Sequence, residues 1–372
     1  EELKGDISVG GRVLVPLRSR KELVAYVLGL REGVRQDLRP IIRPLEGIPL
    51  FPPEMIPLFE WLSSYYVYPI GKLITEILPF KGKSAPSIEL SVGGDPEALK
   101  GLSEEERGAI DSISKRKRGL RLDLALIGEM LKKGYLSIRG PKKDFEGRPR
   151  SFPDPITLTR HQESALREIG RAVRESRFEV CLLHGVTGSG KTQVYIEAIK
   201  EALSVGRSAI ILFPEISLGL YMESLLRAVF GEKLSLYHSH LGNRQRQSQW
   251  MGMLWGHYRV VLGARSAVFA PFRDIGVIIV DEEHEDSYKQ ESGLRYNGRD
   301  VAVLRGMISR CPVILGSATP SIRSYFNALA GKYHLIEMPE RVEEKPLPSV
   351  ELVDMASLRK ETKTFVLISP RM

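Results

Sequence analysis

The stretch GVTGSGKT, Gly185 to Thr192, decides the fold of this chain. It matches the phosphate-loop pattern of a glycine, any four residues, and then Gly-Lys followed by Ser or Thr. The apolar run EVCLLHGV leads into it, and the helical pattern TQVYIEAIKEALSVG follows. Glycines let such a loop curl so that its backbone N–H groups face a phosphate at the start of the helix. We therefore expect a strand, a nucleotide-binding loop and a helix, in this order.

Two residues of the loop carry the predicted chemistry. Lys191 is expected to reach the β- and γ-phosphates of ATP, and the hydroxyl of Thr192 is expected to ligate Mg²⁺. The alternative is a glycine-rich turn with an incidental lysine, which the flanking strand and helix disfavour. The loop residues predicted to bind the nucleotide are Gly185, Thr187, Gly188, Ser189, Gly190, Lys191 and Thr192.

Apolar runs alternate with helical patterns along the second half of the chain. The runs are RSAIILFP, RVVLGA, VIIVDEE and CPVILGSA, and helical patterns such as SLGLYMESLLRAVFG lie between them. Continuous apolar runs separated by helices are typical of a parallel sheet that helices cover on both faces. The predicted fold class is therefore α/β, and ligands are expected at the carboxyl ends of the strands.

The run VIIVDEEH, Val277 to His284, places acidic residues at the end of one such strand. Asp281 would hold Mg²⁺, and Glu282 would orient and deprotonate the attacking water. A strand that ends in acids is common in solvent-facing loops, so the pattern alone is weak. Together with the phosphate loop upstream, it favours a P-loop enzyme that hydrolyses a nucleotide.

Composition bounds the kind of protein. The chain has 372 residues, 42% of them hydrophobic, which predicts two or three globular domains. A formal net charge of +8 is weak support for an anionic partner such as nucleic acid. Cys181 and Cys311 lie in apolar runs and are expected to be buried thiols of a reducing compartment. No apolar segment approaches the ~20 residues of a membrane span, so a soluble, cytosolic protein without a membrane partner is expected.

The first 150 residues have a different pattern. GRVLVPL and LVAYVLGL are typical of paired strands, and a helical segment follows them over residues 51–78. Residues 81–100 are rich in Gly, Pro, Ser and Lys and are expected to form a linker. A helix, a second helix and a hairpin are then expected, the order of a winged-helix domain. Its basic residues, which either bind nucleic acid or form a solvated face, are 115–121, Lys132, Lys133, Lys142 and Lys143.

Several motifs resemble those of known motor proteins. GVTGSGKT, DEEH and GSATPS, in this order, resemble the first motor lobe of superfamily 2 helicases. DEEHEDSYKQE…RYNGRD followed by GSATPS is similar to the PriA family of bacterial replication-restart helicases, also called primosomal protein N′. LTRHQESAL resembles the family's adenine-contacting segment, with Gln162 in the glutamine position, and FPEISL and GARSAVFAPF resemble its two DNA-contacting segments. The similarity extends from LFPPEMIPLFEWLSSYYVYPIGKLITEILPF to VELVDM.

The resemblance implies a multidomain architecture. It implies a β-rich DNA-binding domain over 1–83 that is similar to domains that bind DNA 3′ ends. A winged helix over 100–148 and a RecA-like helicase lobe over 155–340 would follow. Residues 341–372 would lead into a second motor lobe that is absent, so the chain is expected to be a fragment or a member without a complete motor. The family's zinc site lies in that second lobe, and no zinc site is expected here, because two cysteines cannot form a four-ligand site.

The resemblance also implies a function. The expected activity is that of an ATP- and Mg²⁺-dependent 3′-to-5′ DNA helicase in the bacterial cytoplasm, which recognises stalled or branched forks and initiates primosome assembly and replisome reloading. The implied partners are fork DNA with a 3′ end, single-stranded DNA, single-stranded DNA-binding protein and primosome proteins. One alternative is a fork-binding scaffold that binds ATP without productive turnover. Another is an unrelated P-loop translocase with an accessory winged helix.

The resemblance assigns residues around DEEH to DNA binding and coupling. His284 would couple the carboxylates to the DNA-contacting loop, and Ser317 and Thr319 of GSATPS would face Glu282, His284 or the γ-phosphate. The residues expected to bind DNA are Arg265, Tyr288, Lys289, Arg295 and Tyr296. The alternatives remain open: Arg265 capping a strand end, the tyrosines packing on their own lobe, the charged residues forming a solvated loop, and His284 being an ordinary histidine.

The sequence departs from the family in the loop after DEEH. Leu294 stands where the family has Trp, Asn297 where it has His, and Ala264 where it has Thr. The resemblance assigns the sensing of DNA to this loop, so these differences lie where the coupling would act. Upstream, the aromatic cluster of Trp61, Tyr65, Tyr66 and Tyr68 has helical spacing and is expected to be core rather than a platform for bases. His238 and His240 resemble a metal pair only superficially, and no metal is expected there.

Overall fold

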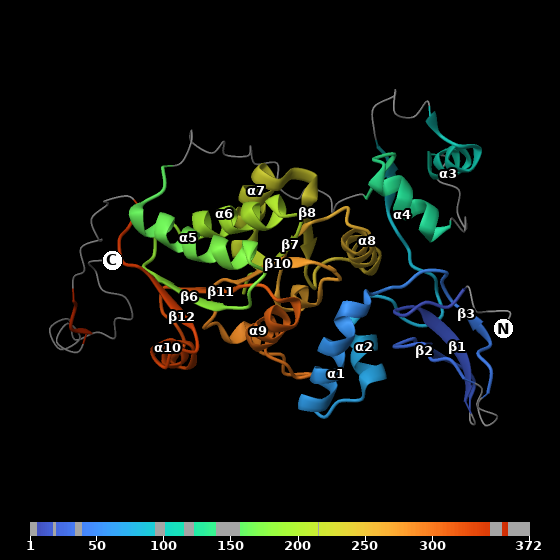
Figure 1. Ribbon diagram of the computed structural model, residues 1–372, viewed down its shortest axis with the longest axis horizontal. Helices are drawn as coiled ribbons and strands as arrows, with labels where there is room; N and C mark the ends of the chain where they lie inside the picture. The colour runs from blue at the N-terminus through green and yellow to red at the C-terminus, as the bar shows by residue number, and fades with distance from the viewer. Residues whose placement is uncertain are drawn as a thin grey trace.

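The computed structural model describes residues 6–17, 20–33, 39–93, 101–114, 123–138, 157–214, 216–342 and 352–355. Figure 1 shows the amino-terminal strands at one end of the molecule and helix α10 (Ile322–Leu329) toward the other. A large parallel sheet organises the second half of the chain, and a small antiparallel sheet begins the first half. This is the α/β, multidomain fold that the sequence predicts.

The central sheet contains seven strands within the described residues, in the order β12-β6-β11-β10-β7-β9-β8, all parallel. The predicted runs form five of them, and the sequence pattern did not reveal β8 and β12, the two edge strands. The strands are β6 (Val180–Gly185), β7 (Ser208–Leu212), β8 (Leu234–Tyr237), β9 (Val260–Gly263), β10 (Ile275–Val280), β11 (Val313–Ser317) and β12 (His334–Met338).

Helices cover both faces of this sheet, as the continuous apolar runs require. Figure 1 shows α5 (Arg160–Arg174) and α6 (Lys191–Ser204) on one side of the strands and α9 (Gly298–Ser309) and α10 on the other. Successive strand residues point to opposite faces, so Leu183 packs in one buried cluster and Leu182 in the other. The remaining helices of the lobe are α7 (Ile216–Phe230) and α8 (Asn243–Leu254).

The amino-terminal region pairs three short strands in the order β2-β1-β3, all antiparallel, and two helices follow them. The sequence suggested one helical segment, but the chain turns between the two helices at Val67, whose φ is 50°, and Pro69. The elements are β1 (Arg12–Leu17), β2 (Arg20–Tyr26), β3 (Arg43–Pro44), a 3₁₀ turn (Pro53–Met55), α1 (Ile56–Tyr65) and α2 (Ile70–Ile77).

A small helical unit follows, with α3 (Glu104–Ser114), α4 (Leu124–Lys132) and β5 (Leu136–Ile138). The partner of β5 is β4 (Leu90–Val92), which comes from the segment expected to be a linker. Lys133, one of the predicted basic residues, pairs with Glu106 at 2.8 Å. The assignment to the winged-helix class stays a prediction, because the basic run 115–121, Lys142 and Lys143 lie outside the described residues. The proline-rich segment 147–156 and most of 341–372 lie outside them as well.

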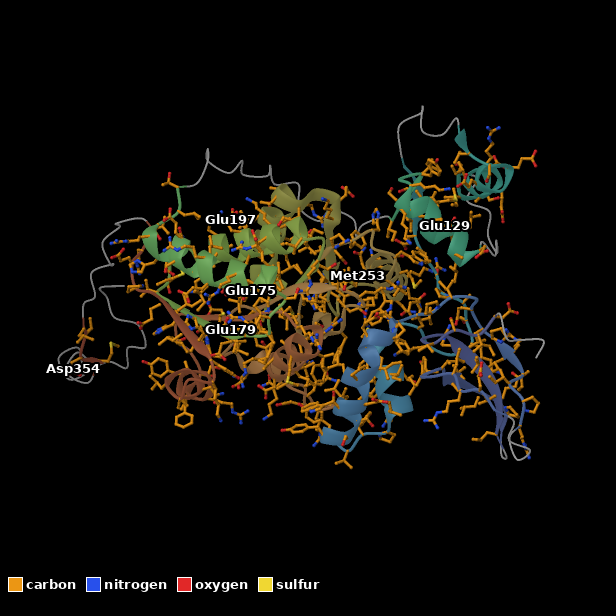
Figure 2. The ribbon with its side chains drawn as sticks, in the orientation of Figure 1. Glu129, Glu175, Glu179, Glu197, Met253 and Asp354 are labelled. Atoms are coloured by element: carbon orange, nitrogen blue, oxygen red, sulfur yellow. The ribbon has the colours of Figure 1, made fainter. Side chains whose placement is uncertain are left out.

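Helix α8 joins the amino-terminal region to the lobe. The indole Nε1 of Trp250 donates to the carbonyl of Leu50 at 2.6 Å, and the side chain of Gln247 donates to the carbonyl of Pro79 at 3.0 Å. The backbone N–H of Ser87 donates in turn to Gln247 at 2.7 Å. Figure 2 shows Met253, a buried residue of α8, among the packed side chains between the two parts. The amino-terminal region and the lobe therefore share one continuous hydrophobic core.

Both cysteines are buried free thiols, as expected, and burial raises the pKa of each above its ordinary value. In the described part of the chain, no helix combines the length and the apolar character that crossing a membrane requires.

Candidate nucleotide-binding site

The phosphate loop runs from the end of β6 to the start of α6, as predicted. Gly188 and Gly190 have φ of +83° and +82°, in the left-handed region that favours glycine. A Cβ atom on Gly190 would lie 2.1 Å from Nε2 of Gln162, so a side chain here would displace Gln162 as well as strain the left-handed backbone. The local fold thus depends on glycine where the phosphate-loop pattern demands it.

Gln162 braces the loop from α5. Its side chain completes a capping box with Thr159, which begins the helix, and its Nε2 donates to the carbonyls of Ser189 and Gly190 at 3.3 and 3.4 Å. The residue is buried. The structure therefore places Gln162 at the loop, while its contact with adenine stays a prediction.

The loop has features that suit a nucleotide phosphate. The Ser189 hydroxyl is buried and finds no hydrogen-bond partner among the residues that the structure describes. The ammonium group of Lys191 donates to the carbonyl of Gly185 at 2.8 Å, and Thr192 follows it in the first turn of α6. A buried unsatisfied hydroxyl is costly, and a phosphate oxygen would supply its missing partner.

Asp281 lies at the carboxyl end of β10, close to the start of α6. The Tyr195 hydroxyl of α6 donates to its Oδ1 at 2.7 Å, and both residues are buried. Burial raises the pKa of Asp281 to about 6, although the Tyr195 hydrogen bond and the charge of Lys191 act in the opposite direction. A desolvated carboxylate of this kind gains from a nearby cation. Sequence reasoning missed Tyr195, which occupies an otherwise apolar position of α6.

Glu282 follows with φ of 43°, a left-handed conformation that is uncommon for a residue with a side chain. Its Oε2 lies 3.6 Å from Nδ1 of His284. Such backbone strain persists only where surrounding contacts hold it, and it concentrates at functional sites. The strain is therefore in keeping with the predicted role of Glu282.

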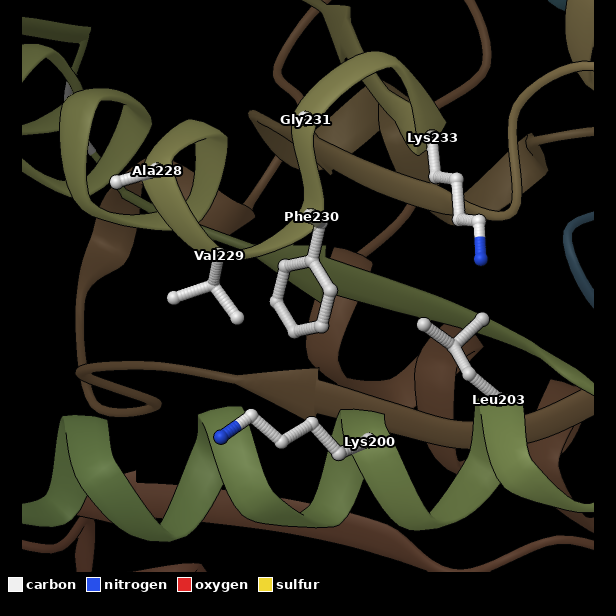
Figure 3. Close-up of a pocket in the computed structure, with 7 residues that line it drawn as sticks. All are labelled: Lys200, Leu203, Ala228, Val229, Phe230, Gly231 and Lys233. Carbon is white, nitrogen blue, oxygen red and sulfur yellow. The ribbon is translucent and has the colours of Figure 1, made fainter. Parts of the chain in front are cut away.

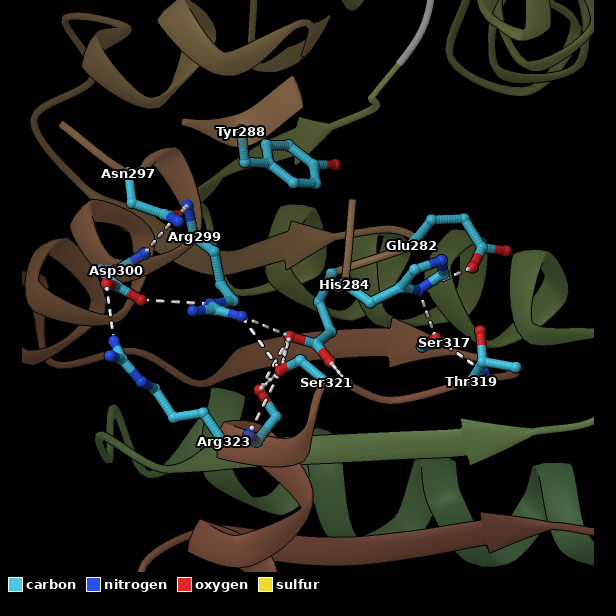
Figure 4. Close-up of polar contacts among 12 residues, drawn as sticks. Glu282, His284, Tyr288, Asn297, Arg299, Asp300, Ser317, Thr319, Ser321 and Arg323 are labelled. Atoms are coloured by element: carbon cyan, nitrogen blue, oxygen red, sulfur yellow. Dashed lines mark hydrogen bonds and ion pairs between the residues drawn. The ribbon is translucent and has the colours of Figure 1, made fainter. Parts of the chain in front are cut away.

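The GSATPS turn contacts the DEEH segment directly. His284 Nδ1 lies 2.8 Å from Oγ of Ser317, and Ser317 Oγ accepts the backbone N–H of Thr319 at 2.9 Å (Figure 4). The backbone N–H of Glu283 donates to the carbonyl of Gly316 at 3.1 Å. The predicted proximity of Ser317 to His284 is thus present in the structure.

Glu283 is a functional candidate that the sequence interpretation missed. This buried carboxylate accepts hydrogen bonds from Arg299 at 3.0 Å, from the backbone and side chain of Ser321 at 2.6 and 3.0 Å, and from Ser324 at 2.8 Å. Arg299 also pairs with Asp300 at 3.1 Å, so it is a bridging residue rather than a solvated one (Figure 4). Glu283 therefore joins the end of β10 to α9 and α10. The one sign of this role in the sequence was the glutamate at the third position of DEEH.

The two tyrosines expected to contact DNA are buried. Tyr288 is 1% exposed and Tyr296 is 4% exposed, so neither ring is open to a base in this structure, which corrects that expectation. Tyr288 donates to the carbonyl of Asp281 at 2.6 Å, and the ring of Tyr296 lies 5.7 Å beneath the guanidinium of Arg265. Both pack on their own lobe because the loop folds back over it.

Of the other residues expected to bind DNA, one braces the loop and two have side chains that are exposed to solvent. Arg265 donates to the carbonyls of Ser287 and Lys289 at 3.2 and 2.7 Å, while the side chains of Lys289 and Arg295 are exposed. Leu294, which replaces the family's Trp, is buried, and the side chain of Asn297 caps α9.

A groove of about 490 Å³ lies elsewhere on the lobe, between α6 and the end of α7 (Figure 3). Lys200, on its α6 side, is about 13 Å along the helix from Lys191, away from the carboxyl ends of the strands. The groove is thus separate from the candidate site. Its lining residues are Lys200, Leu203, Ala228, Val229, Phe230, Gly231 and Lys233.

Sequence comparison places this site in a family. The sequence model of the PriA 3′DNA-binding domain (3′BD) matches residues 1–79, and that of the DEAD/DEAH box helicase matches residues 159–327. The replication restart protein PriA of Chlamydia muridarum is 32% identical over 99% of this chain and 53% of its own length. PriA of Synechocystis is 44% identical over 81% of this chain and 37% of its own length, and PriA of Bacillus subtilis is 42% identical over 61% and 28%.

Almost the whole chain matches the curated Chlamydia relatives, and it spans about half of their length. The matched helicase segment contains the phosphate loop, DEEH and GSATPS, whose contacts are described above. The chain belongs to the PriA family of replication restart proteins.

Proposed function

We propose that the chain is part of an ATP-dependent 3′-to-5′ DNA helicase that recognises stalled or branched forks and starts primosome assembly and replisome reloading. One observation carries this proposal. The acidic segment at the phosphate loop is joined by polar contacts both to the GSATPS turn and to the loop of residues 287–299. Such a chain of contacts suits a motor in which nucleotide state and DNA binding influence each other.

The nucleotide would be held at the carboxyl ends of β6 and β10. The phosphate-loop backbone and Lys191 would bind the phosphates, Thr192 and Asp281 would hold Mg²⁺, and Gln162 would read the base. Bound ATP supplies the phosphoanhydride bond whose hydrolysis drives motion, and Mg²⁺ neutralises phosphate charge. Glu282 would orient the attacking water and accept its proton. Tyr195 would fix the orientation of the Asp281 carboxylate.

DNA would bind through the exposed cations of the loop, while its two buried tyrosines would pack the loop onto the lobe. Lys289 and Arg295 would contact phosphates, Arg265 would brace the loop from below, and His284 would connect it to Glu282. The domain division, with DNA binding at 1–83 and 100–148 and a RecA-like lobe at 155–340, is part of this proposal. Its first and last parts are supported by the matched sequence models over residues 1–79 and 159–327. Single-stranded DNA-binding protein, primosome proteins, a zinc site in a second lobe and a cytoplasmic location belong to the proposal by resemblance.

The phosphate-loop assignment is tested with Lys191→Ala. We expect ATP hydrolysis stimulated by forked DNA to fall by roughly 10²–10³-fold, the loss typical of removing one group that stabilises the transition state. Lys200→Ala is the matched control, since Lys200 lies on the same helix, is exposed and, among the residues that the structure describes, pairs with Glu197 alone. Hydrolysis that survives Lys191→Ala would refute the assignment.

Two further outcomes separate the alternatives. Tight ATP binding without turnover in the complete protein would favour the fork-binding scaffold. Fork binding should weaken steeply with added salt because phosphate contacts release counterions, and a flat salt response would contradict the DNA part of the proposal.

A further inference from the structure

Helix α1 presents aromatic rings to solvent. Trp61 is 38% exposed and Tyr65 is 65% exposed, and their rings stack at a centroid distance of 4.4 Å and an interplanar angle of 12°. Tyr66 meets Tyr65 edge-on at 4.9 Å. We call Trp61, Tyr65 and Tyr66 the α1 aromatic cluster. Helical spacing had predicted that these residues belong to the core, and this is wrong for Trp61 and Tyr65.

The reason lies in which face of α1 is buried. Leu58, Phe59 and Leu62 supply the residues of this helix that enter the core. Trp61 and Tyr65, four residues apart, form a second stripe that faces outward. Single exposed aromatics are common, but here two are stacked in parallel, and a contiguous exposed apolar patch is what marks an interaction site. The core therefore does not account for this stripe.

The stripe is held in place at the end of α1. Ser63 Oγ donates to the carbonyl of Tyr68 at 2.7 Å across the turn that follows the helix. The hydroxyl of Tyr66 accepts the backbone N–H of Asn297 at 3.5 Å. A rigid aromatic surface loses little conformational entropy when a flat ligand binds to it.

The cluster borders the loop that carries the exposed cations. The Leu294 N–H donates to Oε2 of Glu76 on α2 at 2.8 Å, so the loop contacts the two amino-terminal helices at Leu294 and at Asn297. Arg295 lies between these two contacts and is exposed. On α2, the ammonium group of Lys72 lies 4.9 Å from the ring centroid of Tyr68. Aromatic faces beside cations are the combination that binds single-stranded nucleic acid.

We propose that the α1 aromatic cluster is a stacking platform for the unpaired bases of single-stranded DNA, next to the loop that carries Lys289 and Arg295. The proposal rests on the proposed DNA-binding function and adds a position for the single strand to it. Unpaired bases suit this surface because they stack on parallel rings, whereas the bases of a duplex are stacked on each other. Arg295 and Lys72 would contact the phosphates of the same strand.

The test compares the wild type with Trp61→Ala/Tyr65→Ala on three labelled DNAs: an oligothymidine, a fork with a single-stranded arm and a blunt duplex. We expect the double variant to bind the oligothymidine and the fork about 10–100-fold more weakly, because each stacked base contributes substantially to affinity. Binding to the blunt duplex and the salt dependence of binding should stay unchanged, because no phosphate contact is removed.

Two control variants accompany it. Tyr325→Ala/Phe326→Ala removes aromatics of similar exposure, 40% and 64%, from α10 and should leave binding unchanged. Trp61→Phe/Tyr65→Phe keeps two aromatic faces and should bind oligothymidine within about threefold of the wild type, since stacking needs only the ring. Circular dichroism spectra and thermal unfolding of every variant establish that it is folded.

A spectroscopic measurement keeps the proposal testable even if the double alanine variant fails to fold. Oligothymidine should quench part of the tryptophan fluorescence of the wild type, and this part should be absent in Trp61→Phe. A wild type that binds none of the DNAs would refute the proposed function and the platform together. A wild type that binds oligothymidine with no change in the double variant or in the Trp61 signal would refute the platform alone. An equal loss on blunt duplex would refute it too.

Discussion

Gly316 shows how tightly individual residues of the site are fitted together. A Cβ atom added to it would lie 1.7 Å from the Tyr195 hydroxyl oxygen, which donates to Asp281. Only glycine at the start of the GSATPS turn therefore leaves room for the bond that orients the Asp281 carboxylate. The glycine that begins this turn is a steric requirement of the site rather than a feature of an ordinary turn.

Gly316→Ala should destabilise the protein by about 1–3 kcal/mol, because overpacking forces Tyr195 to move. Adding Tyr195→Phe to this variant removes the clashing oxygen and should recover part of the loss. Urea denaturation of the two single variants, the double variant and the wild type gives the interaction energy between the two sites. Additive effects of the two substitutions would contradict the steric explanation.

At the residue scale, the sequence predicted the candidate reacting groups but not the residues that orient them. Lys191, Thr192 and Asp281 follow from motifs whose spacing is local. Tyr195 contacts Asp281, 86 residues away, and Glu283 contacts Arg299 and Ser321, 16 and 38 residues away, through contacts that only packing creates. The same limit explains why the sequence left open whether Tyr288 and Tyr296 contact DNA or pack on their own lobe, since a tyrosine in a loop has no pattern that reveals which way its ring turns.

At the level of elements, Glu283 connects three parts of the lobe. It lies just after β10, its ion pair reaches Arg299 in α9, and its hydrogen bonds reach Ser321 and Ser324 at the start of α10. A movement of the DEEH segment would therefore displace both helices together. We infer that this carboxylate transmits changes at the nucleotide site to the loop that precedes α9.

Glu283→Gln should destabilise the lobe by about 3–5 kcal/mol, because it leaves the Arg299 guanidinium without its buried partner. It should also reduce the stimulation of ATP hydrolysis by DNA more than it reduces hydrolysis without DNA. Arg323→Ala is the control, since its pair with Asp300 is exposed and should contribute less than about 1 kcal/mol. Equal losses with and without DNA would contradict the transmitting role.

Elements with a strong local pattern were predicted well, and those that depend on distant partners were not. The strands next to the phosphate loop and the helix after it lie where the sequence placed them. Strand β4 was missed because it has three residues and pairs with β5, more than forty residues later. The single predicted helix of the amino-terminal region is divided by a turn whose φ of 50° at Val67 no helical spacing could reveal.

At the scale of the whole molecule, α8 makes the amino-terminal region and the lobe one cooperative body. Trp250 is fully buried, and its indole N–H reaches the carbonyl of Leu50, two hundred residues earlier in the chain. The segment of residues 79–89 adds backbone hydrogen bonds to Gln247 and Ser248 of the same helix. DNA bound at the amino-terminal region would thus act on the motor lobe through a packed interface.

Trp250→Ala should make the amino-terminal region and the lobe unfold separately. We expect it to cost about 3–5 kcal/mol and to convert one cooperative thermal transition of these parts into two, because the shared core loses its largest side chain. Trp255→Phe, a milder change at the end of the same helix next to Gly128 of α4, should retain the single transition. Calorimetry of the three proteins distinguishes these outcomes. A single transition in Trp250→Ala would show that the coupling of the two parts does not depend on Trp250.

The sequence by itself determined the phosphate loop, the α/β class and the acidic strand end, because glycine patterns and apolar runs act within a few residues of themselves. The tertiary structure alone decided that Glu283 binds Arg299, that Tyr195 holds Asp281, that Trp61 and Tyr65 face solvent, and that Trp250 reaches Leu50. These facts depend on which side of a helix meets which neighbour, and that choice is made by packing the whole chain at once rather than by local propensity.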